Sequence, residues 1–379
     1  MPQKQYDYII AGMGCAGLSL AMHMIKSGRF SNKKILLVDE APKNKNDRTW
    51  CFWETEPGLF ESIVYKRWEH LWFYSDNFYK EFSIRPYHYK MIRGIDFYNY
   101  CYEEIKQHPA FEIGYGKVEQ VFSDTKTGVV IGGEIIYSEY VFNSILFEKP
   151  LLKRGQHWLL QHFKGWKIQL EESTFDHQVA TLMDFRIPQQ HGTAFCYLLP
   201  FSATEALIEY TLFTPSLLKE QEYEAELKNY IQHILHIDKF TITEKESGII
   251  PMTNFKFPTH EANIINIGTA GGQTKGSSGY TFYFIQKHCK ELMTSLAKTG
   301  KPFIAKPSPK FHFYDSVLLH ILANNTLPGK DIFSTLFEKN KVQNVLRFLN
   351  NESSILQDIQ IISSLPTLPF IKAAAKQYF

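Results

Sequence analysis

A glycine pattern near the N-terminus constrains the fold of this chain more than any other feature. Gly12, Gly14 and Gly17 lie between an apolar run at 8–11 and apolar residues that repeat at helical spacing as far as Gly28. This order predicts a strand, a tight glycine turn and a helix. In dinucleotide-binding folds the first glycine permits the turn, the second lets the backbone approach a pyrophosphate, and the third lets the helix pack on the strand. We therefore expect a Rossmann-type unit, with free N–H groups of the helix directed at phosphates.

A second apolar run, 34–38, leads directly to Asp39, which comes 22 residues after Gly17. An acid at the end of the second strand accepts hydrogen bonds from a ribose in such units. Glycines alone would indicate only an ordinary turn, but here the flanking elements and the acid agree, so we predict dinucleotide binding. The pattern does not distinguish FAD from NAD(P).

Later segments suggest that this unit is discontinuous. Strand patterns fill the middle of the chain, and a strand at 264–268, a glycine-rich loop at 269–279 and a helix at 280–297 then return to the order of the N-terminal unit. The last 70 residues have helical periodicity. We expect an α/β fold with a dinucleotide-binding domain, an inserted antiparallel-sheet substrate domain and a helical C-terminal region. Their predicted ranges are 1–150 with 245–300, 151–244, and 301–379.

Composition and charge exclude some classes of function. The 41 Lys and Arg residues nearly balance 39 Asp and Glu, so the chain lacks the basic surplus of a nucleic-acid binder. Five scattered cysteines without a Cys-x-x-Cys pair argue against a disulfide framework or a zinc site and indicate a reducing compartment. No signal-peptide pattern and no apolar run long enough to span a membrane are present. The aromatic content of 15% suits a bulky apolar or cationic ligand, although core packing also uses such residues.

A series of short motifs runs through nearly the whole chain. They are Asp47–Phe52, Tyr89–Phe97, Gly165-Trp166, Leu182–Phe185, Tyr197–Ser202, Ile208–Thr211, Gly248–Met252, Ile267–Gly272 and Gly279–Phe282. Each motif alone would be unspecific. In this order and spacing they closely resemble the bacterial branch of the lycopene β-cyclase family of carotenoid biosynthesis.

The resemblance implies a cofactor, a reaction and a cellular location. It implies non-covalent FAD on a fold similar to aromatic hydroxylases and geranylgeranyl reductases. It implies conversion of the acyclic ψ-ends of lycopene to β-rings, via γ-carotene to β-carotene, without net redox change. The flavin would act in its reduced form, with NAD(P)H only as reductant. Lycopene and related carotenes would be the substrates, reached from the cytoplasm at a membrane surface.

Two alternatives remain open at this stage. A related FAD-dependent isoprenoid reductase or monooxygenase would share the fold but transfer hydride or oxygen. A dinucleotide-binding module without catalysis is the other. The expected burial of the acid Glu209 argues against the non-catalytic module, because a protein that only binds a dinucleotide does not need a buried acid.

Glu209 is our candidate for the proton-transfer carboxylate. Cyclisation begins with protonation of a terminal double bond, so the site needs an acid, a base and electron density near a cation. The neighbours of Glu209 are apolar or aromatic, and burial of a strand there would raise its pKa. It also matches the functional glutamate of the resembled family. Alternatively, Glu209 faces outward from its strand.

Asp184 is the second candidate carboxylate, on a neighbouring predicted strand. Two acids on one sheet face can divide the acid and base duties. One acid could also simply orient the other. The remaining alternatives for Asp184 are a solvated strand residue or an ion pair with Arg186.

The remaining candidates concern the cofactor and the membrane. We expect the cofactor to be bound by Gly12, Gly14, Gly17, Asp39, Arg48, Gly268, Thr269, Gly271, Gly272 and Lys275. Thr269 stands where the wider flavoprotein superfamily has an acid, which matches the cyclase branch. Arg48 would pair with phosphates or structural carboxylates, and Lys275 would face the flavin edge or solvent. We expect no metal ligands, and an apolar surface patch near Phe333, Phe337, Ile355 and Ile359. The alternative for any one of these four residues is ordinary packing between helices.

Overall fold

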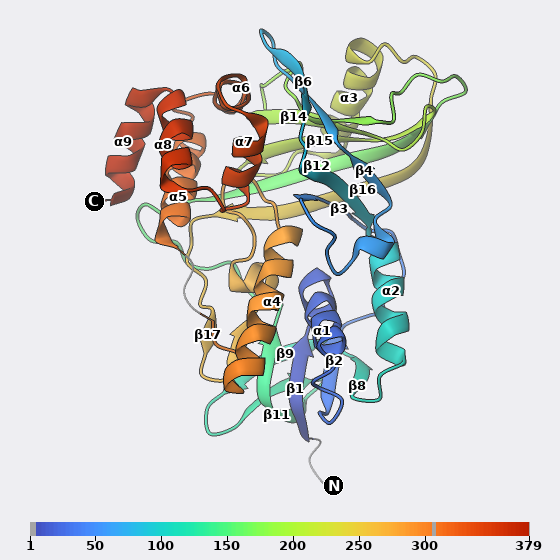
Figure 1. Cartoon of the computed structure of the whole chain (residues 1–379), viewed down its shortest axis with the longest axis vertical. Coiled ribbons are helices and arrows are strands. Elements are labelled where there is room, and N and C mark those ends of the chain that lie inside the picture. The colour runs from blue at the N-terminus through green and yellow to red at the C-terminus, as the bar shows by residue number, and fades with distance from the viewer. Residues whose placement is uncertain (1–4, 305–307, 379) are drawn as a thin grey trace.

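The structure is a computed structural model that describes residues 5–304 and 308–378 (Figure 1). The strands are β1 (Gln5–Ala11), β2 (Ile35–Asp39), β3 (Thr49–Glu54), β4 (Lys66–Trp68), β5 (His70–Tyr74), β6 (Tyr79–Ser83), β7 (His88–Arg93), β8 (Phe111–Tyr115), β9 (Val118–Ser123), β10 (Thr127–Ile131), β11 (Glu134–Asn143), β12 (Trp158–Gln169), β13 (Val179–Asp184), β14 (Thr193–Pro200), β15 (Glu205–Thr214), β16 (Thr241–Thr253), β17 (His260–Glu261) and β18 (Ile264–Asn266). The helices are α1 (Cys15–Ser27), α2 (Gly94–Lys106), α3 (Glu220–Asn229), α4 (Phe282–Thr299), α5 (Pro309–Ala323), α6 (Gly329–Lys339), α7 (Val342–Leu349), α8 (Ile355–Ser364) and α9 (Thr367–Tyr378).

The first sheet has the order β17-β18-β11-β1-β2-β8, with β9 and β10 attached beside β11. Strand β1 pairs parallel with both β2 and β11, and β11 pairs parallel with β18. Helices α1 and α4 lie together on one face of this sheet (Figure 1). Apolar side chains of both helices, such as Leu20 and Leu292, share one core with the strands. This arrangement confirms the predicted Rossmann-type unit and its late strand–loop–helix return.

The second sheet has the order β16-β12-β15-β14-β13-β5-β6. Its long strands β12, β15 and β14 are antiparallel neighbours, whereas β13 pairs parallel with β5. Strands β5 and β6 come from the N-terminal part of the chain, so the sheet extends beyond the segment 151–244. The predicted division into domains stays a prediction.

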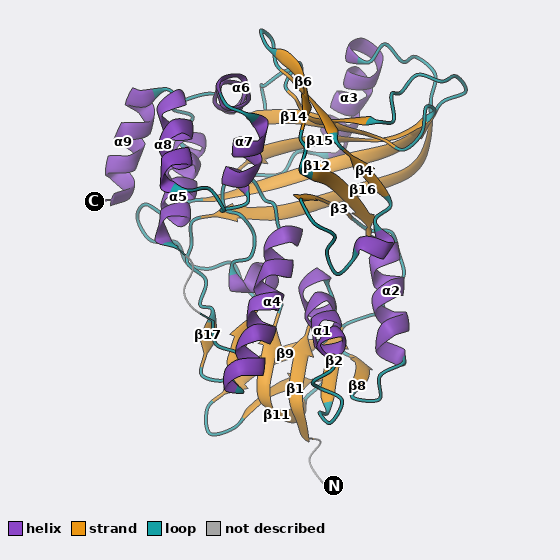
Figure 2. Cartoon of the chain, viewed as in Figure 1, coloured by secondary structure: helices purple, strands orange, loops and turns teal. Residues whose placement is uncertain are grey.

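A small sheet of β3, β7 and β4 lies near the large second sheet (Figure 2). The hydroxyl of Thr49 on β3 donates a hydrogen bond of 2.8 Å to Glu246 on β16. The motif that contains Thr49 is thereby connected to the edge strand of the second sheet.

Helices α5–α9 form the predicted helical C-terminal region, beside the second sheet (Figure 1). Helix α6 packs on the sheet through Phe333, which stacks on Phe185, and Phe337, which stacks on Phe73. Phe333 and Phe337 are 2% and 1% exposed, so their predicted place in a surface patch is wrong. The other two predicted patch residues, Ile355 and Ile359, are 68% and 59% exposed. Phe333 and Phe337 instead hold the helices against the sheet.

Candidate functional site

The glycine turn between β1 and α1 has the geometry expected of a phosphate-binding loop. A Cβ atom on Gly12 would lie 2.2 Å from Ser144 Oγ, and one on Gly17 would lie 2.0 Å from the Gly12 carbonyl oxygen. Gly14 differs, because a Cβ there would meet nothing within 4 Å. Gly14 is also the N-cap of α1, and no side chain caps the free N–H groups of the helix. Gly12 and Gly17 therefore close the turn, while Gly14 opens it to a ligand.

Asp39 holds the glycine turn from the end of β2. One carboxylate oxygen accepts a hydrogen bond of 2.7 Å from the Met13 backbone N–H, and the other accepts one of 2.9 Å from Lys43. The acid is thus placed beside the turn, as the sequence spacing predicts. Its contact with a ribose stays a prediction.

The late glycine loop, η3 (Gly268–Gly271), reaches the first turn of α1. Gly268 has a φ of +63°, and a Cβ there would lie 2.7 Å from Ala16 Cβ. Gly271 is closed by the Asn266 carbonyl oxygen, which a Cβ would approach to 2.2 Å, and Gly272 has a φ of +77°. Thr269 lies in the same turn, with its hydroxyl 3.3 Å from that of Thr274. The structure therefore brings both glycine segments to one place.

Arg48 and Lys275 have different surroundings. The Arg48 guanidinium is about half exposed, bonds Asp47 at 3.0 Å, and is near enough to Cys15 on α1 to influence its thiol. Lys275 is buried, and its ammonium donates hydrogen bonds of 2.7 Å to both Asp315 and Asn351. Lys275 therefore links the late glycine loop to α5 through its ion pair with Asp315. Nothing in this arrangement supports its predicted place at the flavin edge.

Two buried polar atoms without a partner lie at the end of the late glycine segment. They are Gln161 Oε1, which lies 2.0 Å from the position of a Cβ on Gly279, and Tyr280 Oη on the next residue. Such atoms are rare in proteins unless a ligand or water satisfies them. Together with the open face at Gly14 and the uncapped helix, they fit a dinucleotide with a polar ring system.

Glu209 lies in the middle of the second sheet, opposite a glycine. Across the sheet, Glu246, Gly165, Glu209 and Tyr197 occupy one row of paired residues on β16, β12, β15 and β14. A Cβ on Gly165 would lie 3.0 Å from the Cγ atoms of both glutamates. The missing side chain of Gly165 therefore lets the two carboxyl groups meet over β12.

The surroundings of Glu209 favour its neutral form. Burial raises the pKa of Glu209 well above its usual value, and so do the negative charge of Glu246 and a hydrogen bond shared with Glu246. Although part of its surface stays accessible, protein atoms enclose the carboxyl group, and low local polarity penalises an isolated charge. A protonated carboxylic acid at neutral pH is what a proton-donating site requires.

Aromatic and thiol groups surround this acid. Burial raises the pKa values of Cys51 and Tyr197, and both groups are close enough to Glu209 to interact with its carboxyl group. Tyr280 adjoins Tyr197, and its ring meets Trp53 edge to face at 4.6 Å. The sheet face around Glu209 is therefore rich in π-electron density, and Lys167, the lysine on that face, pairs with Glu205 and Glu244 rather than with Glu209.

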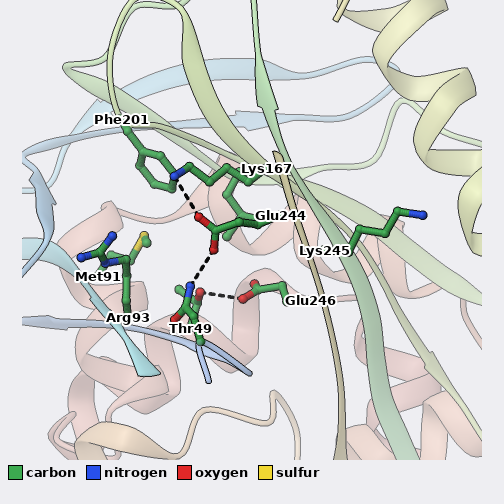
Figure 3. A pocket seen from close by; sticks show the side chains of 10 residues that line it. Thr49, Met91, Arg93, Lys167, Phe201, Glu244, Lys245 and Glu246 are labelled. Carbon is green, nitrogen blue, oxygen red and sulfur yellow. Dashed lines mark hydrogen bonds and ion pairs between the residues drawn. The ribbon is translucent and has the colours of Figure 1, made fainter. Parts of the chain in front are cut away.

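A small pocket opens beside the carboxylate pair, with a volume of about 370 Å³ including its mouth (Figure 3). Glu246 is among its lining residues, and Glu209 is not. Figure 3 shows Glu244 linked to Lys167, an ion pair of 3.1 Å, and Lys245 directed away from the others. Most of its lining residues are polar or charged, and the pocket gives Glu246 a route to solvent.

Asp184 has no part in this pair. It pairs with Cys196, which places it on the opposite sheet face from Glu209. Its buried carboxylate accepts hydrogen bonds from Arg186, at 2.6 and 2.9 Å, and from Tyr230 at 2.9 Å. The prediction that both acids share one sheet face is wrong, and the alternative of an ion pair with Arg186 is confirmed.

Sequence reasoning missed Glu246. Its strand alternates polar residues and ends in the motif Gly248–Met252, but nothing in that pattern separates Glu246 from Glu244, two residues earlier on the same face. The one available signal was Gly165 in its own motif, because a glycine inside a strand often marks a close approach. Among the described residues, no group of three or more His, Cys, Asp or Glu side chains is placed to hold a metal ion.

Comparison with known proteins places these features in a family. The family model described as "Lycopene cyclase protein" matches residues 7–375. Lycopene beta-cyclase of Pantoea ananas is 25% identical over 266 residues, which cover 66% of this chain and 63% of that protein. Capsanthin/capsorubin synthase of Capsicum annuum is 25% identical over 309 residues, covering 74% of this chain and 58% of that protein. The match thus spans less than two thirds of the length of these relatives.

Solved structures resemble the chain over nearly its whole length. A geranylgeranyl bacteriochlorophyll reductase-like protein of Thermoplasma acidophilum has a TM-score of 0.62 at 11% identity, covering 99% of this chain and 97% of that one. A p-nitrophenol 4-monooxygenase of Pseudomonas putida has a TM-score of 0.56 at 12% identity, covering 98% and 99%. These likenesses establish the fold: the mixed α/β fold of FAD-dependent oxidoreductases, here with a helical C-terminus.

Proposed function

This chain belongs to the lycopene cyclase family, and from that membership we propose that it is a flavin-dependent lycopene β-cyclase. It converts the acyclic ψ-ends of lycopene into β-rings, via γ-carotene to β-carotene. The observation that carries the proposal is the enclosed carboxyl group of Glu209, kept protonated on a sheet face rich in aromatic side chains.

Glu209 supplies the proton that starts the reaction. Its proton adds to C2 of the terminal C1=C2 double bond and leaves a tertiary cation at C1. The C5=C6 bond then attacks C1, the charge moves to C5, and loss of the C6 proton completes the ring. One proton enters and one leaves, so the reaction is an isomerisation with no net redox change.

The aromatic surroundings suit the travelling cation. Ring faces attract cations, worth ~0.5–2 kcal/mol each when desolvated. Tyr197 and Tyr280 lie beside Glu209 and Cys51, and burial raises the pKa of both phenols, so the rings stay uncharged. These rings also keep water, which would capture the cation, away from the acid.

The cofactor of this proposal is FAD, reduced by NAD(P)H. Bound in its reduced form, FAD would supply negative charge near the cation. Of the chain's own residues, Gly14 and the uncapped start of α1 would approach the pyrophosphate. The half-exposed Arg48 would neutralise phosphate charge. The closed turns at Gly12 and Gly268 would hold both loops in place.

We also propose that the protein works at the cytoplasmic surface of a membrane. Lycopene is a hydrocarbon that has to be drawn from lipid, and none of the described helices is long and apolar enough to span a bilayer. Helices α8 and α9 expose an apolar set that we call the α8–α9 surface: Ile355, Leu356, Ile359, Ile362, Leu368 and Ile371.

The charges near the α8–α9 surface fit anionic lipid. Lys372 and Lys376 are exposed on α9, and the one acid between residues 353 and 378, Asp358, is buried and paired with Lys310 at 2.7 Å. Apolar side chains with flanking lysines are the composition of an interfacial helix. The five cysteines are all unpaired, in keeping with a reducing compartment.

Expression of the full chain in lycopene-accumulating cells, with analysis of the pigments, tests the activity. We expect γ-carotene and β-carotene to form. With purified protein, product should accumulate without stoichiometric loss of NAD(P)H. One NAD(P)H consumed per product would instead identify the related reductase or monooxygenase. Unchanged lycopene in cells that hold folded, flavin-loaded protein would overturn the proposal.

A further inference from the structure

Glu209 and Glu246 differ from the other acids on their strands. Glu205 and Glu244 lie on the same face, and both pair with Lys167, at 3.0 and 3.1 Å. In the part of the chain that the structure describes, the ion pairs include neither Glu209 nor Glu246. The sheet therefore neutralises the outer acids with a lysine and leaves the two inner acids to one another.

The backbone at Gly165 allows the carboxyl groups of Glu209 and Glu246 to come into contact. Gly165, on β12, lies between Glu209 on β15 and Glu246 on β16. The Cβ atom of any larger residue there would lie 3.0 Å from the Cγ atoms of both glutamates. One Glu246 oxygen accepts a hydrogen bond from Thr49, and the other is buried where, among the described residues, the carboxyl group of Glu209 is the partner it meets. A buried carboxylate oxygen that meets only a second carboxyl group is a position for a shared proton.

We propose that Glu246 is a positioning residue that holds Glu209 in its protonated form, the two carboxyl groups sharing one proton across Gly165. This proposal rests on the proposed function, because the proton held on Glu209 is the one that starts the cyclisation. Because Glu246 also lines the polar pocket, it connects the pair to solvent, from which a spent proton is replaced.

Other groups near the pair do not change charge in the neutral range. On the aromatic side the titratable groups are Cys51, Tyr89, Tyr197 and Tyr280, and burial raises the pKa of each of these four, so they stay neutral. On the pocket side the charged groups are Arg93, Lys245 and the ion pair of Lys167 with Glu244. Two carboxylates in contact cannot both ionise, so one proton stays on the pair until the pH rises well above the usual carboxyl range.

The substitution Glu246→Gln tests this directly in the full-length protein. Glutamine keeps the shape and removes the charge, so the pKa of Glu209 falls. Because the protonated form is the active one, the alkaline limit of kcat should move to lower pH, by about one pH unit or more. Glu246→Asp keeps the charge and should restore the wild-type limit, at a lower kcat. Glu205→Gln, which removes an ion-paired acid from the same face, should leave the limit unchanged.

A second readout separates this proposal from the activity itself. In difference infrared spectra without substrate, the C=O band of a protonated carboxylic acid should persist above neutral pH and vanish in Glu209→Gln. In Glu246→Gln that band should be lost at lower pH than in the wild type. Gly165→Ala, which forces the glutamates apart, should shift it in the same direction. A band that titrates alike in wild type and Glu246→Gln would overturn the proposal, whether or not the protein cyclises lycopene.

Discussion

Asp184 and Glu209 lie on opposite faces of the same sheet. Asp184 pairs with Cys196, Cys196 pairs with Tyr210, and Glu209 is the next residue along β15, with its side chain on the other side. Asp184 is bonded to Arg186 and Tyr230, while Glu209 meets Glu246. The two acids are therefore separate in space and have different partners, and substitutions should distinguish their roles.

Replacing Glu209 by Gln should abolish cyclisation while the protein stays folded. The amide keeps the size of the side chain but cannot deliver a proton, and loss of a general acid costs ~10²–10⁴-fold in rate. Glu209→Asp should fall between, because it withdraws the acid by about one methylene. Pigment yield, FAD content and thermal unfolding should be measured together. Near wild-type pigment from flavin-loaded Glu209→Gln would remove Glu209 from the mechanism.

Replacing Asp184 by Asn should reduce stability rather than catalysis. The carboxylate is fully buried and accepts hydrogen bonds from Arg186 and Tyr230, so the amide leaves a charged partner poorly satisfied. We expect a loss of about 1–3 kcal/mol in the free energy of unfolding. Urea denaturation measures that loss, and kcat per folded molecule should stay near the wild-type value. A large drop in kcat without loss of stability would return Asp184 to the catalytic site.

Two glycines of the turn should respond differently to a larger side chain. Gly14→Val has room in the protein, because a Cβ there meets nothing within 4 Å, so the variant should fold but lack FAD. Gly17→Val would place a Cβ 2.0 Å from a carbonyl oxygen and should destabilise the fold itself. Thermal unfolding and flavin absorbance of the purified variants measure the two effects. Wild-type FAD content in folded Gly14→Val would contradict the assignment of this turn.

Charge placed on the α8–α9 surface should weaken membrane binding. Leu356 and Ile359 are 80% and 59% exposed, so Leu356→Asp and Ile359→Asp should barely affect stability. The added acids should reduce co-flotation with anionic liposomes. Leu151, 93% exposed and outside this surface, provides the control Leu151→Asp. Equal flotation of all three variants and wild type would locate lipid contact elsewhere.

Structural elements that are specified by residues close together in the chain were predictable from the sequence. Gly12, Gly14 and Gly17 specify their turn through steric limits within a few residues, and the structure confirms that unit. Glu209 was singled out by its motif and its apolar neighbours, but strand alternation alone left open whether the acid faces the protein or solvent. Helical periodicity likewise predicted the C-terminal region, but it did not tell Phe333, which packs on the sheet, from Ile355, which is exposed.

The sequence did not predict which residues the charged side chains would contact. Lys275 is buried against Asp315, 40 residues away, and Glu246 meets Glu209 from the far side of β12. Asp184 and Glu209 both lie on predicted strands, yet the irregular register of β13 helps decide which face Asp184 takes. Such pairings depend on strand order and register, and these are fixed by packing among distant segments.

The sequence by itself determined the dinucleotide turn and the strand and helix types, because each depends on short-range sterics and hydrophobic periodicity, whereas Glu209 became a candidate acid through its motif and stays a prediction. Only the tertiary structure decided that Glu246 is the partner of Glu209. That choice arises where β16, β12 and β15 align so that Gly165 stands between the two glutamates. Because Gly165 has no side chain, the residues that flank it on β15 and β16 can approach each other. Which residues flank it is decided only when the sheet has folded.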